Sequence, residues 1–283
     1  MTIAIFGATG KLGGDVLDIL LERGVPAGDI LALGRNAERL AQLAERGFRT
    51  ERVDLDQPEG LADTLRGIDA ALLISTADPG NRLWQHQAAV AAAKEAGISH
   101  LVYTSALHAP TSSLVLAPDH KATEEYITAS GVPATFLRNG WYTENLVADF
   151  DAARAGTIAN SVADGRIAGA PRREFAEAAA VVLTTEGHAG QAYELSGDDS
   201  WSYEEFAVAA GEVLGTPVAY QSLSAEEERD QLLGFGLDEG TAAFVVTLNG
   251  GLREGEMSDT TGDLTRLIAH PTEPLITTLR TWH

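Results

Sequence analysis

The order of predicted strands and helices favours an α/β fold in which helices cover both faces of one parallel sheet. Apolar strands alternate with helical segments from residue 2 to residue 138. The segment 70–74 is almost entirely apolar, as is typical of a parallel strand buried on both faces. The chain also opens with a strand, a glycine turn and a helix. These features predict a Rossmann-type doubly wound parallel sheet, with a smaller C-terminal α/β lid domain in the second half of the chain.

The first residues combine a strand, a tight turn and the start of a helix. Residues 2–6 are mostly apolar, three regularly spaced glycines follow, and apolar residues then recur at helical spacing. Gly7 would permit the tight turn, Gly10 would let the backbone approach a phosphate, and Gly13 would let the helix pack closely on the strand. Backbone N–H groups at a helix N-terminus suit a pyrophosphate, so the turn predicts dinucleotide binding; an ordinary strand–helix corner is the alternative. The residues assigned to this turn are Gly7, Ala8, Thr9, Gly10, Lys11, Leu12 and Gly13.

The end of the second predicted strand, residues 30–33, carries a cation where NAD-specific sites carry an acid. Gly34, Arg35 and Asn36 follow that strand directly. An arginine can bind a 2′-phosphate and stack on adenine, and Lys11 could add a second positive charge. The pattern therefore favours NADPH over NADH. The alternative is that Arg35 and Lys11 are solvated charges at the starts of their helices.

The carboxyl ends of the later strands predict further cofactor contacts. In a doubly wound sheet the ligand lies over these ends. Ser75, Thr76 and Ala77 follow the strand 70–74, and we expect them to touch the cofactor. The other elements expected up to residue 138 are helices at 36–47, 57–66, 81–96 and 119–131, with Asp119 as a cap of the last, and strands at 49–53, 100–104 and 133–137.

A segment dense in hydrogen-bonding and aromatic groups, residues 138–145, follows the last of these strands. It falls where the nicotinamide end of the cofactor should lie. For Trp141 and Tyr142 the alternative is packing at the junction between two domains.

The pattern becomes looser in the second half, where we expect a smaller lid with the substrate cleft between the two domains. The expected boundaries are 1–153 for the NADP(H)-binding domain and 154–283 for the lid, with a strand at 191–196 returning to the main sheet. Residues 156–170 look irregular, and residues 234–258 mix glycine with apolar and acidic residues and indicate a mobile cover. The other expected elements are helices at 141–155, 174–185 and 271–279, an extended segment at 217–221, and helices opened by capping boxes at 202–205 and 224–227.

The composition excludes several classes of function. There are no cysteines, which excludes disulfides, thiolate metal sites and cysteine nucleophiles, and the histidines show no metal-like pairing. A formal net charge of −21 disfavours nucleic-acid binding. No apolar run is long enough to span a membrane and the chain begins directly with a strand, so we expect a cytoplasmic protein without membrane contact. The oligomeric state stays open, and a homodimer is compatible with the sequence.

Short segments spread over nearly the whole chain resemble one known group of proteins. They are residues 7–13, 74–76, 103–109, 138–145, 193–197 and 270–272. They resemble the NmrA-like atypical short-chain dehydrogenases, and within that group the type 2 NADPH:quinone oxidoreductases. The resemblance implies two-electron transfer from NADPH to a quinone or a related electrophile, without a flavin. It also implies that NADPH is bound by the glycine turn, Arg35, Ser75, Thr76, Ala77, Asn139, Gly140, Trp141, Tyr142, Thr143 and Glu144.

One departure from typical short-chain dehydrogenases bears on the chemistry. Those enzymes use a Tyr-x-x-x-Lys pair, but here His120 stands in place of the lysine and Leu116 stands four residues earlier. The missing acid argues against simple alcohol–ketone chemistry, in which an alkoxide must be protonated. A reduced quinone is a stabilised anion that water can protonate, so positioning of donor and acceptor could suffice. His120 could help as a partial charge or proton source near neutral pH. The alternative for His120 is a hydrogen-bonded residue in the first turn of a helix. Tyr142 is a second candidate for substrate contact.

Two other functions are compatible with the sequence. The missing tyrosine acid, together with the regulators of the NmrA-like group, favours as an alternative a non-catalytic redox sensor that binds NADP(H). A reductase or isomerase of another small carbonyl compound or sugar is disfavoured by the missing Tyr-x-x-x-Lys pair. The sequence does not identify the electron acceptor, because the lid that would select the acceptor is the part whose structure is hardest to predict from the sequence.

Overall fold

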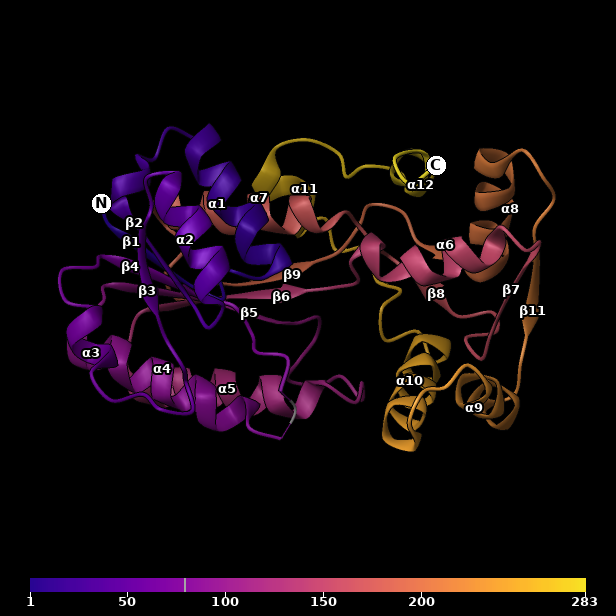
Figure 1. The fold of residues 1–283 in the computed structure, drawn as a ribbon, viewed down its shortest axis with the longest axis horizontal. Helices are drawn as coiled ribbons and strands as arrows, with labels where there is room; N and C mark the ends of the chain where they lie inside the picture. The colour runs from indigo at the N-terminus through magenta and orange to yellow at the C-terminus, as the bar shows by residue number, and fades with distance from the viewer. Residues whose placement is uncertain (79) are drawn as a thin grey trace. The chain divides into compact units, whose positions relative to one another are not determined.

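The computed structural model describes residues 1–78 and 80–283, which form two compact units (Figure 1). The first unit contains Met1–Pro110, Leu116–Asn139 and Arg172–Glu194, and the second contains Thr111–Val115, Gly140–Pro171 and Leu195–His283. The chain therefore leaves the first unit and returns to it twice. Residues 140–153 fall in the second unit, and the helix that begins at Arg172 falls in the first.

A sheet of seven strands forms the centre of the first unit among the described residues. The strands are β1 (Ile3–Phe6), β2 (Ile30–Gly34), β3 (Arg49–Arg52), β4 (Ala70–Leu73), β5 (His100–Ala106), β6 (Ala134–Asn139) and β9 (Ala192–Leu195). Their order is β3-β2-β1-β4-β5-β6-β9, and Ile3 of β1 lies opposite Ile30 on one side and Ala70 on the other, both in parallel register. The strand order thus reverses beside β1, at the switch point where doubly wound sheets bind ligands.

Helices cover both faces of this sheet, so the predicted doubly wound α/β fold is confirmed. The helices of the first unit are α1 (Lys11–Glu22), α2 (Ala37–Glu45), α3 (Leu61–Thr64), α4 (Arg82–Ala96), α5 (Ala117–Ser130), α7 (Arg172–Thr184) and the short 3₁₀ helix η1 (Ala27–Asp29). Figure 1 shows α1, α2 and α7 on one face, and α3, α4 and α5 on the other. Arg172 of α7 donates to Asp15 of α1 at 2.7 Å, which joins the two helices.

Burial in the first unit follows the position of each strand in the sheet. All residues of β1 and β4 are buried, and so are the first four residues of β2. The strand at the edge, β3, is polar and mostly exposed. The near-continuous apolar character of residues 70–74 therefore reflects a strand that is covered on both faces, as predicted. Each buried Leu or Ile side chain stabilises the fold by roughly 1.5–3 kcal/mol.

The second unit contains two small sheets of two strands each among its described residues. The strand β7 (Thr157–Asn160) pairs in parallel with β11 (Ala219–Ser222), and β8 (Arg166–Ile167) pairs antiparallel with β10 (Trp201–Ser202). Its helices are η2 (Thr143–Leu146), α6 (Val147–Ala153), α8 (Tyr203–Leu214), α9 (Ala225–Gly234), α10 (Glu239–Arg253), α11 (Asp263–Ile268) and α12 (Leu275–Arg280).

Both predicted capping boxes open helices of this unit. The Ser202 hydroxyl accepts from the Glu205 amide at the start of α8, and the Glu205 carboxylate accepts from the Ser202 amide in return. Ser224 and Glu227 form the same reciprocal pair at the start of α9. Each box satisfies two helix-end amides, so these two local predictions are confirmed.

Most of residues 234–258, the segment expected to be a mobile cover, forms the helix α10; its mobility stays a prediction. Asp238 caps the helix by accepting from the Thr241 amide at 3.0 Å. A Cβ on Gly251 would lie 2.6 Å from Cδ1 of Leu114. Glycine therefore stands in this helix where a neighbouring side chain approaches closely, which sequence inspection read as flexibility.

Smaller predictions also need correction. Residues 156–170, expected to be irregular, contain β7 and β8, and the helix expected over 57–66 is reduced to α3. Residues 141–155 are divided between η2 and α6. Asp119 does not cap α5, because the helix starts earlier; it lies in the first turn, where a negative charge is favourable.

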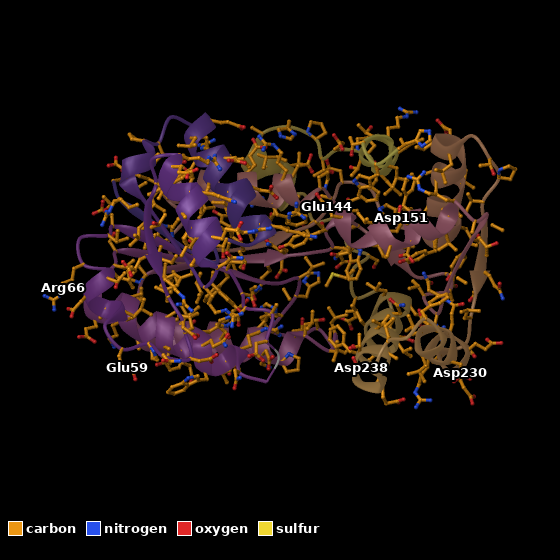
Figure 2. All side chains as sticks on the ribbon, in the orientation of Figure 1. Glu59, Arg66, Glu144, Asp151, Asp230 and Asp238 are labelled. Carbon is orange, nitrogen blue, oxygen red and sulfur yellow. The ribbon has the colours of Figure 1, made fainter. Side chains whose placement is uncertain are left out.

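Most charged side chains are spread over the surface of both units. Figure 2 shows Glu59, Arg66, Asp230 and Asp238 extending away from the ribbon, and all four are exposed. Within residues 1–78 and 80–283, every helix is too short or too polar to cross a lipid bilayer.

Candidate functional site

The glycine turn joins β1 to α1 and is fixed to the neighbouring strand. Gly7 has a φ of +81°, a conformation that favours glycine. Its amide and that of Ala8 both donate to the carbonyl oxygen of Leu33 on β2, at 3.1 and 3.0 Å. A Cβ on Gly13 would overlap the Gly7 carbonyl oxygen and would lie 2.7 Å from the Ala8 Cα. The backbone therefore needs glycine at both positions, for the turn at Gly7 and for close packing at Gly13.

The start of α1 offers unpaired backbone donors. The helix begins at Lys11, after Gly10 as its N-cap residue. The amides of Lys11, Leu12 and Gly13 have no carbonyl partner one turn earlier in the helix. The aligned peptide dipoles add partial positive charge here, and the first turn holds no acidic residue to cancel it. This helix start is suited to a phosphate group.

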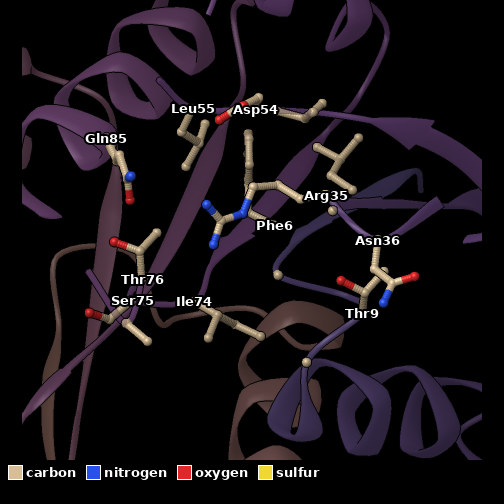
Figure 3. A pocket seen from close by; sticks show the side chains of 16 residues that line it. Phe6, Thr9, Arg35, Asn36, Asp54, Leu55, Ile74, Ser75, Thr76 and Gln85 are labelled. Atoms are coloured by element: carbon tan, nitrogen blue, oxygen red, sulfur yellow. The ribbon is translucent and has the colours of Figure 1, made fainter. Parts of the chain in front are cut away.

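A cavity of about 370 Å³ lies beside this turn, over the carboxyl ends of β1, β2 and β4 (Figure 3). Its position is the switch point of the sheet, and its size falls in the usual range for small-molecule sites. The lining residues are Phe6, Gly7, Thr9, Gly10, Leu33, Gly34, Arg35, Asn36, Val53, Asp54, Leu55, Ile74, Ser75, Thr76, Ala77 and Gln85.

Arg35 provides the positive charge inside the cavity. Figure 3 shows its guanidinium extending into the middle of the space, with Thr76 and Gln85 on one side and Thr9 and Asn36 on the other. The Arg35 side chain forms no ion pair with any residue that the structure describes. Because no carboxylate neutralises it, this guanidinium can bind an anionic group of a ligand.

The start of α2 ties the region of Arg35 to the glycine turn. Asn36 caps the helix by accepting from the Arg39 amide at 3.0 Å. Nη1 of Arg39 donates to the carbonyl oxygen of Thr9 at 2.8 Å. A Cβ on Gly34 would lie 2.6 Å from Oγ1 of Thr9, so glycine at 34 leaves room for that side chain. Sequence reasoning missed Arg39; the available signal was a cation in the first turn of the helix that follows β2.

The far end of the cavity carries an acid and an amide that sequence reasoning also missed. Asp54 follows β3, and its carboxylate accepts from the Asp56 amide at 3.1 Å. Gln85 of α4 donates to the Asp56 carboxylate at 3.0 Å. An acceptor such as Asp54 can bind the exocyclic amino group of adenine. The signal available in the sequence was an acid at the carboxyl end of a predicted strand.

The segment after β4 forms the opposite wall of the cavity. The Ser75 amide donates to Oγ1 of Thr104 at 2.9 Å, which attaches this segment to β5. The Thr76 hydroxyl oxygen is buried and has no hydrogen-bond partner among the described residues. Because this oxygen is shielded from solvent, Thr76 contributes to the cavity wall through its other atoms.

His120 belongs to a buried cluster of aromatic side chains. Its Nδ1 lies 2.9 Å from the hydroxyl of Tyr103, which also lies 3.5 Å from Nδ1 of His86. Burial, and then the charge of Arg82, lowers the pKa of His120 to about 4. The ring is therefore neutral at neutral pH, which argues against the expected role as a partial charge or proton source near neutral pH. The structure places it as a hydrogen-bonded residue near the start of α5, which was the alternative.

Arg138 of β6 joins three elements through two carboxylates. Its Nε and Nη2 donate to Glu124 at 2.9 and 2.7 Å, and Nη1 donates to Glu194 at 2.7 Å. These hydrogen bonds, led by those to Glu124, raise the pKa of Arg138 above its usual range. Ser105 also donates to Glu124 at 2.6 Å, and the His108 amide donates to Glu194 at 2.8 Å. The cluster holds the carboxyl ends of β5, β6 and β9 beside α5.

The predicted cofactor segment 139–144 does not line the cavity. Asn139 is the last residue of β6, and the residues after it fall in the second unit. Tyr142 forms an isolated parallel bridge with Ala170. The indole N–H of Trp141 is buried without a hydrogen-bond partner among the described residues. The residues of this segment in the second unit are Gly140, Trp141, Tyr142, Thr143 and Glu144.

The structure thus brings together only part of the predicted cofactor residues. Those that line the cavity are Gly7, Thr9, Gly10, Arg35, Ser75, Thr76 and Ala77. Those in the adjacent turn and helix start that do not line it are Ala8, Lys11, Leu12 and Gly13; Lys11 is exposed, and the other three are buried.

The chain is similar to known proteins over nearly its whole length. A family model described as NAD(P)H-binding matches residues 7–186. The chain is 40% identical over 274 residues to quinone oxidoreductase 2 of Escherichia coli (strain K12), with 96% of each chain covered. Its structure is similar to that of an NADPH-dependent quinone oxidoreductase of Escherichia coli complexed with NADPH, with a TM-score of 0.95, 39% identity and 99% of each chain covered. It is also similar to the triphenylmethane reductase of Citrobacter sp. complexed with NADP(H), with a TM-score of 0.93, 37% identity and 100% of each chain covered.

Proposed function

The chain belongs to the NAD(P)H-binding family of oxidoreductases, and on this premise we propose that it transfers a hydride from NADPH to a quinone or a related electrophile, without a flavin. The observation that carries the proposal is the cavity beside the glycine turn, with the unpaired guanidinium of Arg35 inside it. The similarity to reductases that were solved with NADPH or NADP(H) supports it.

The residues around the cavity fit this cofactor. The free amides at the start of α1 would bind the pyrophosphate, and Arg35 would bind the 2′-phosphate. Asp54 would accept from the adenine amino group. Gly34, the residue that ends β2, is followed by Arg35 rather than by an acid, so the carboxylate that holds the ribose hydroxyls in NAD sites is missing. These features support a preference for NADPH over NADH.

For this reaction the protein mainly has to position the hydride donor and the acceptor. Bound NADPH supplies the hydride. A reduced quinone is a stabilised phenolate-type anion, so water can complete its protonation and no strong acid is needed. A neutral His120 can offer only a hydrogen bond, and Tyr142 stays our second candidate for contact with the acceptor. Residues 139–144 stay candidates for the nicotinamide end of the cofactor.

The first test is the oxidation of NADPH, followed by its absorbance, with and without a simple benzoquinone. We expect quinone-dependent oxidation that is faster with NADPH than with NADH. In Arg35→Ala, the KM for NADPH should rise about 10- to 100-fold, because a charge-assisted hydrogen bond to the 2′-phosphate is lost. The KM for NADH should change little. Arg66→Ala is the control, since it removes the same charge from an exposed position.

Two results would overturn parts of the proposal. Tight NADPH binding with no oxidation by any quinone would favour the non-catalytic redox sensor, which the absence of a Tyr-x-x-x-Lys pair keeps open. An equal loss of affinity for NADPH and NADH in Arg35→Ala would mean that Arg35 does not recognise the 2′-phosphate.

A further inference from the structure

The side chain of Gln85 offers a hydrogen-bond acceptor at the far end of the cavity. Gln85 belongs to α4, lines the cavity and is 3% exposed. Its Nε2 donates to Oδ1 of Asp56 at 3.0 Å. We propose that Gln85, oriented by Asp56, recognises the exocyclic amino group of the adenine ring of NADPH and selects adenine over a base that carries an oxygen at that position. This inference rests on the NADPH binding proposed above.

The contact with Asp56 fixes which end of the Gln85 amide faces the cavity. A glutamine amide has a donor end and an acceptor end, and half a turn of the side chain exchanges them. An ionised carboxylate only accepts hydrogen bonds, so the donor end, Nε2, has to face Asp56. Oε1 is then the group of Gln85 that faces away from Asp56.

This oxygen is open to the cavity. Oε1 of Gln85 forms no hydrogen bond with any residue that the structure describes, yet, unlike the hydroxyl oxygen of Thr76, it is reached by solvent. Because the side chain is otherwise buried and lines the cavity, solvent reaches this oxygen from there. Figure 3 shows the Gln85 amide at the tip of its side chain, between Leu55 and Thr76. A ligand with an N–H group at this place would satisfy the free oxygen.

A second acceptor lies at the same end of the cavity, on the turn that follows β3. Oδ1 of Asp54 accepts from the Asp56 amide at 3.1 Å, and the Gln57 amide donates to the Asp54 carbonyl oxygen at 3.0 Å. These two hydrogen bonds close the turn, so Asp54 and Asp56 are held on one ordered segment. Asp54 lines the cavity, whereas Asp56 does not line it and holds Gln85 instead.

The chemistry of this end of the cavity matches one edge of adenine. With the pyrophosphate at the start of α1 and the 2′-phosphate at Arg35, the base would extend toward the end that holds Asp54 and Gln85. The exocyclic amino group of adenine has two hydrogens and can donate one to each of these acceptors. Hypoxanthine carries a carbonyl oxygen at the same position, so it would bring an acceptor against two acceptors. The pair therefore favours adenine.

The test compares NADPH with its hypoxanthine analogue, deamino-NADPH, and measures each Kd by calorimetry on the free protein without a quinone. We expect the parent protein to bind NADPH at least about 10-fold more tightly than the analogue. In Gln85→Met the Kd for NADPH should rise about 10-fold and that for deamino-NADPH should change less than about 3-fold, because only the amino group loses a partner. Gln87→Met is the matched control: Gln87 lies on the same helix and does not line the cavity, so neither Kd should change.

Asp56→Ala tests the orientation of the amide separately. This change keeps the main-chain contact with Asp54 but releases Nε2 of Gln85, so the amide can turn over and donate to the oxygen of hypoxanthine. We expect the Kd for deamino-NADPH to fall and the preference for NADPH to shrink to within about 3-fold. A general loss of structure would instead raise the Kd of both cofactors alike.

Each part of the inference has a result that would overturn it. Equal binding of the two cofactors by the parent protein, or an equal rise of both Kd values in Gln85→Met, would overturn the role of Gln85. An unchanged preference in Asp56→Ala would overturn the role of Asp56. If Gln85→Met does not unfold cooperatively in urea, Gln85→Leu takes its place. A parent protein that binds neither cofactor would overturn both proposals, whereas an intact preference for adenine without quinone reduction would overturn only the reaction.

Discussion

At the scale of single residues, burial decides what a charged side chain contributes. The Arg138 side chain is 17% exposed and lies between the carboxylates of Glu124 and Glu194. In Arg138→Met, two carboxylates would face each other in a largely buried place without a cation. We expect the free energy of unfolding to fall by about 3–5 kcal/mol, measured by urea unfolding with circular dichroism.

The matched control removes an arginine whose ion pair is in water. Arg66 pairs with Asp63, and both side chains are more than 70% exposed. Arg66→Met should change the free energy of unfolding by less than about 1 kcal/mol. Similar losses in the two variants would show that burial of the Arg138 cluster is not what makes it stabilising.

At the scale of elements, the contact between β1 and α1 decides whether the turn can form a phosphate site. A Cβ on Gly13 would meet backbone atoms of Gly7 and Ala8, which cannot rotate away. We expect Gly13→Ala to lower the free energy of unfolding by about 1–3 kcal/mol and to weaken NADPH binding. Gly14 has no atom within 4 Å of a Cβ, so Gly14→Ala should stabilise α1 by up to about 1 kcal/mol. Thermal unfolding of both variants checks this pair, and equal stability would contradict the role of Gly13.

At the scale of the whole molecule, buried neutral histidines make stability depend on pH. Burial lowers the pKa of His86 to about 3 and that of His120 to about 4, against about 6.5 in an unfolded chain. Below pH 6.5 the unfolded chain gains two protons that the folded chain does not bind, so stability falls as the pH falls. Asp149 opposes this, because burial raises its pKa to about 6 and the folded chain then binds a proton that the unfolded chain does not.

His86 and His120 together outweigh Asp149 by one proton below pH 6, and burial also lowers the pKa of His100 and of His188, which adds to the proton excess of the unfolded chain. We therefore expect the free energy of unfolding to fall by at least about 1.4 kcal/mol for each pH unit between pH 6 and pH 5, and to change much less from pH 7 to pH 8. Urea unfolding across this range measures the slope. In Asp149→Asn the opposing group is gone, so the slope should steepen by about a further 1.4 kcal/mol for each pH unit. A stability that does not change below pH 6 would mean that the two histidines titrate normally.

The fold of the first unit was predictable because its signals are local and repeated. Strand and helix periods alternate from residue 2 to residue 138, and the central strands β1, β2 and β4 are short apolar runs, whereas the edge strand β3 is polar. The second unit was harder to predict, since glycine is ambiguous there. The glycines of residues 234–258 suggested an irregular cover, yet one of them, Gly251, lies in α10 where Leu114 packs against the helix.

The sequence by itself determined the doubly wound sheet, the turn around Gly7, the cation at Arg35 and the polar strand end at Thr76, because spacing along the chain encodes all of these. Only the tertiary structure decided that Asp54 shares a cavity with Arg35, and that the ring of His120 is neutral. The physical reason is that burial and hydrogen-bond partners depend on elements that meet across the sheet. The contact between Gln85 and Asp56 is of this second kind, since it depends on where α4 lies relative to the turn after β3.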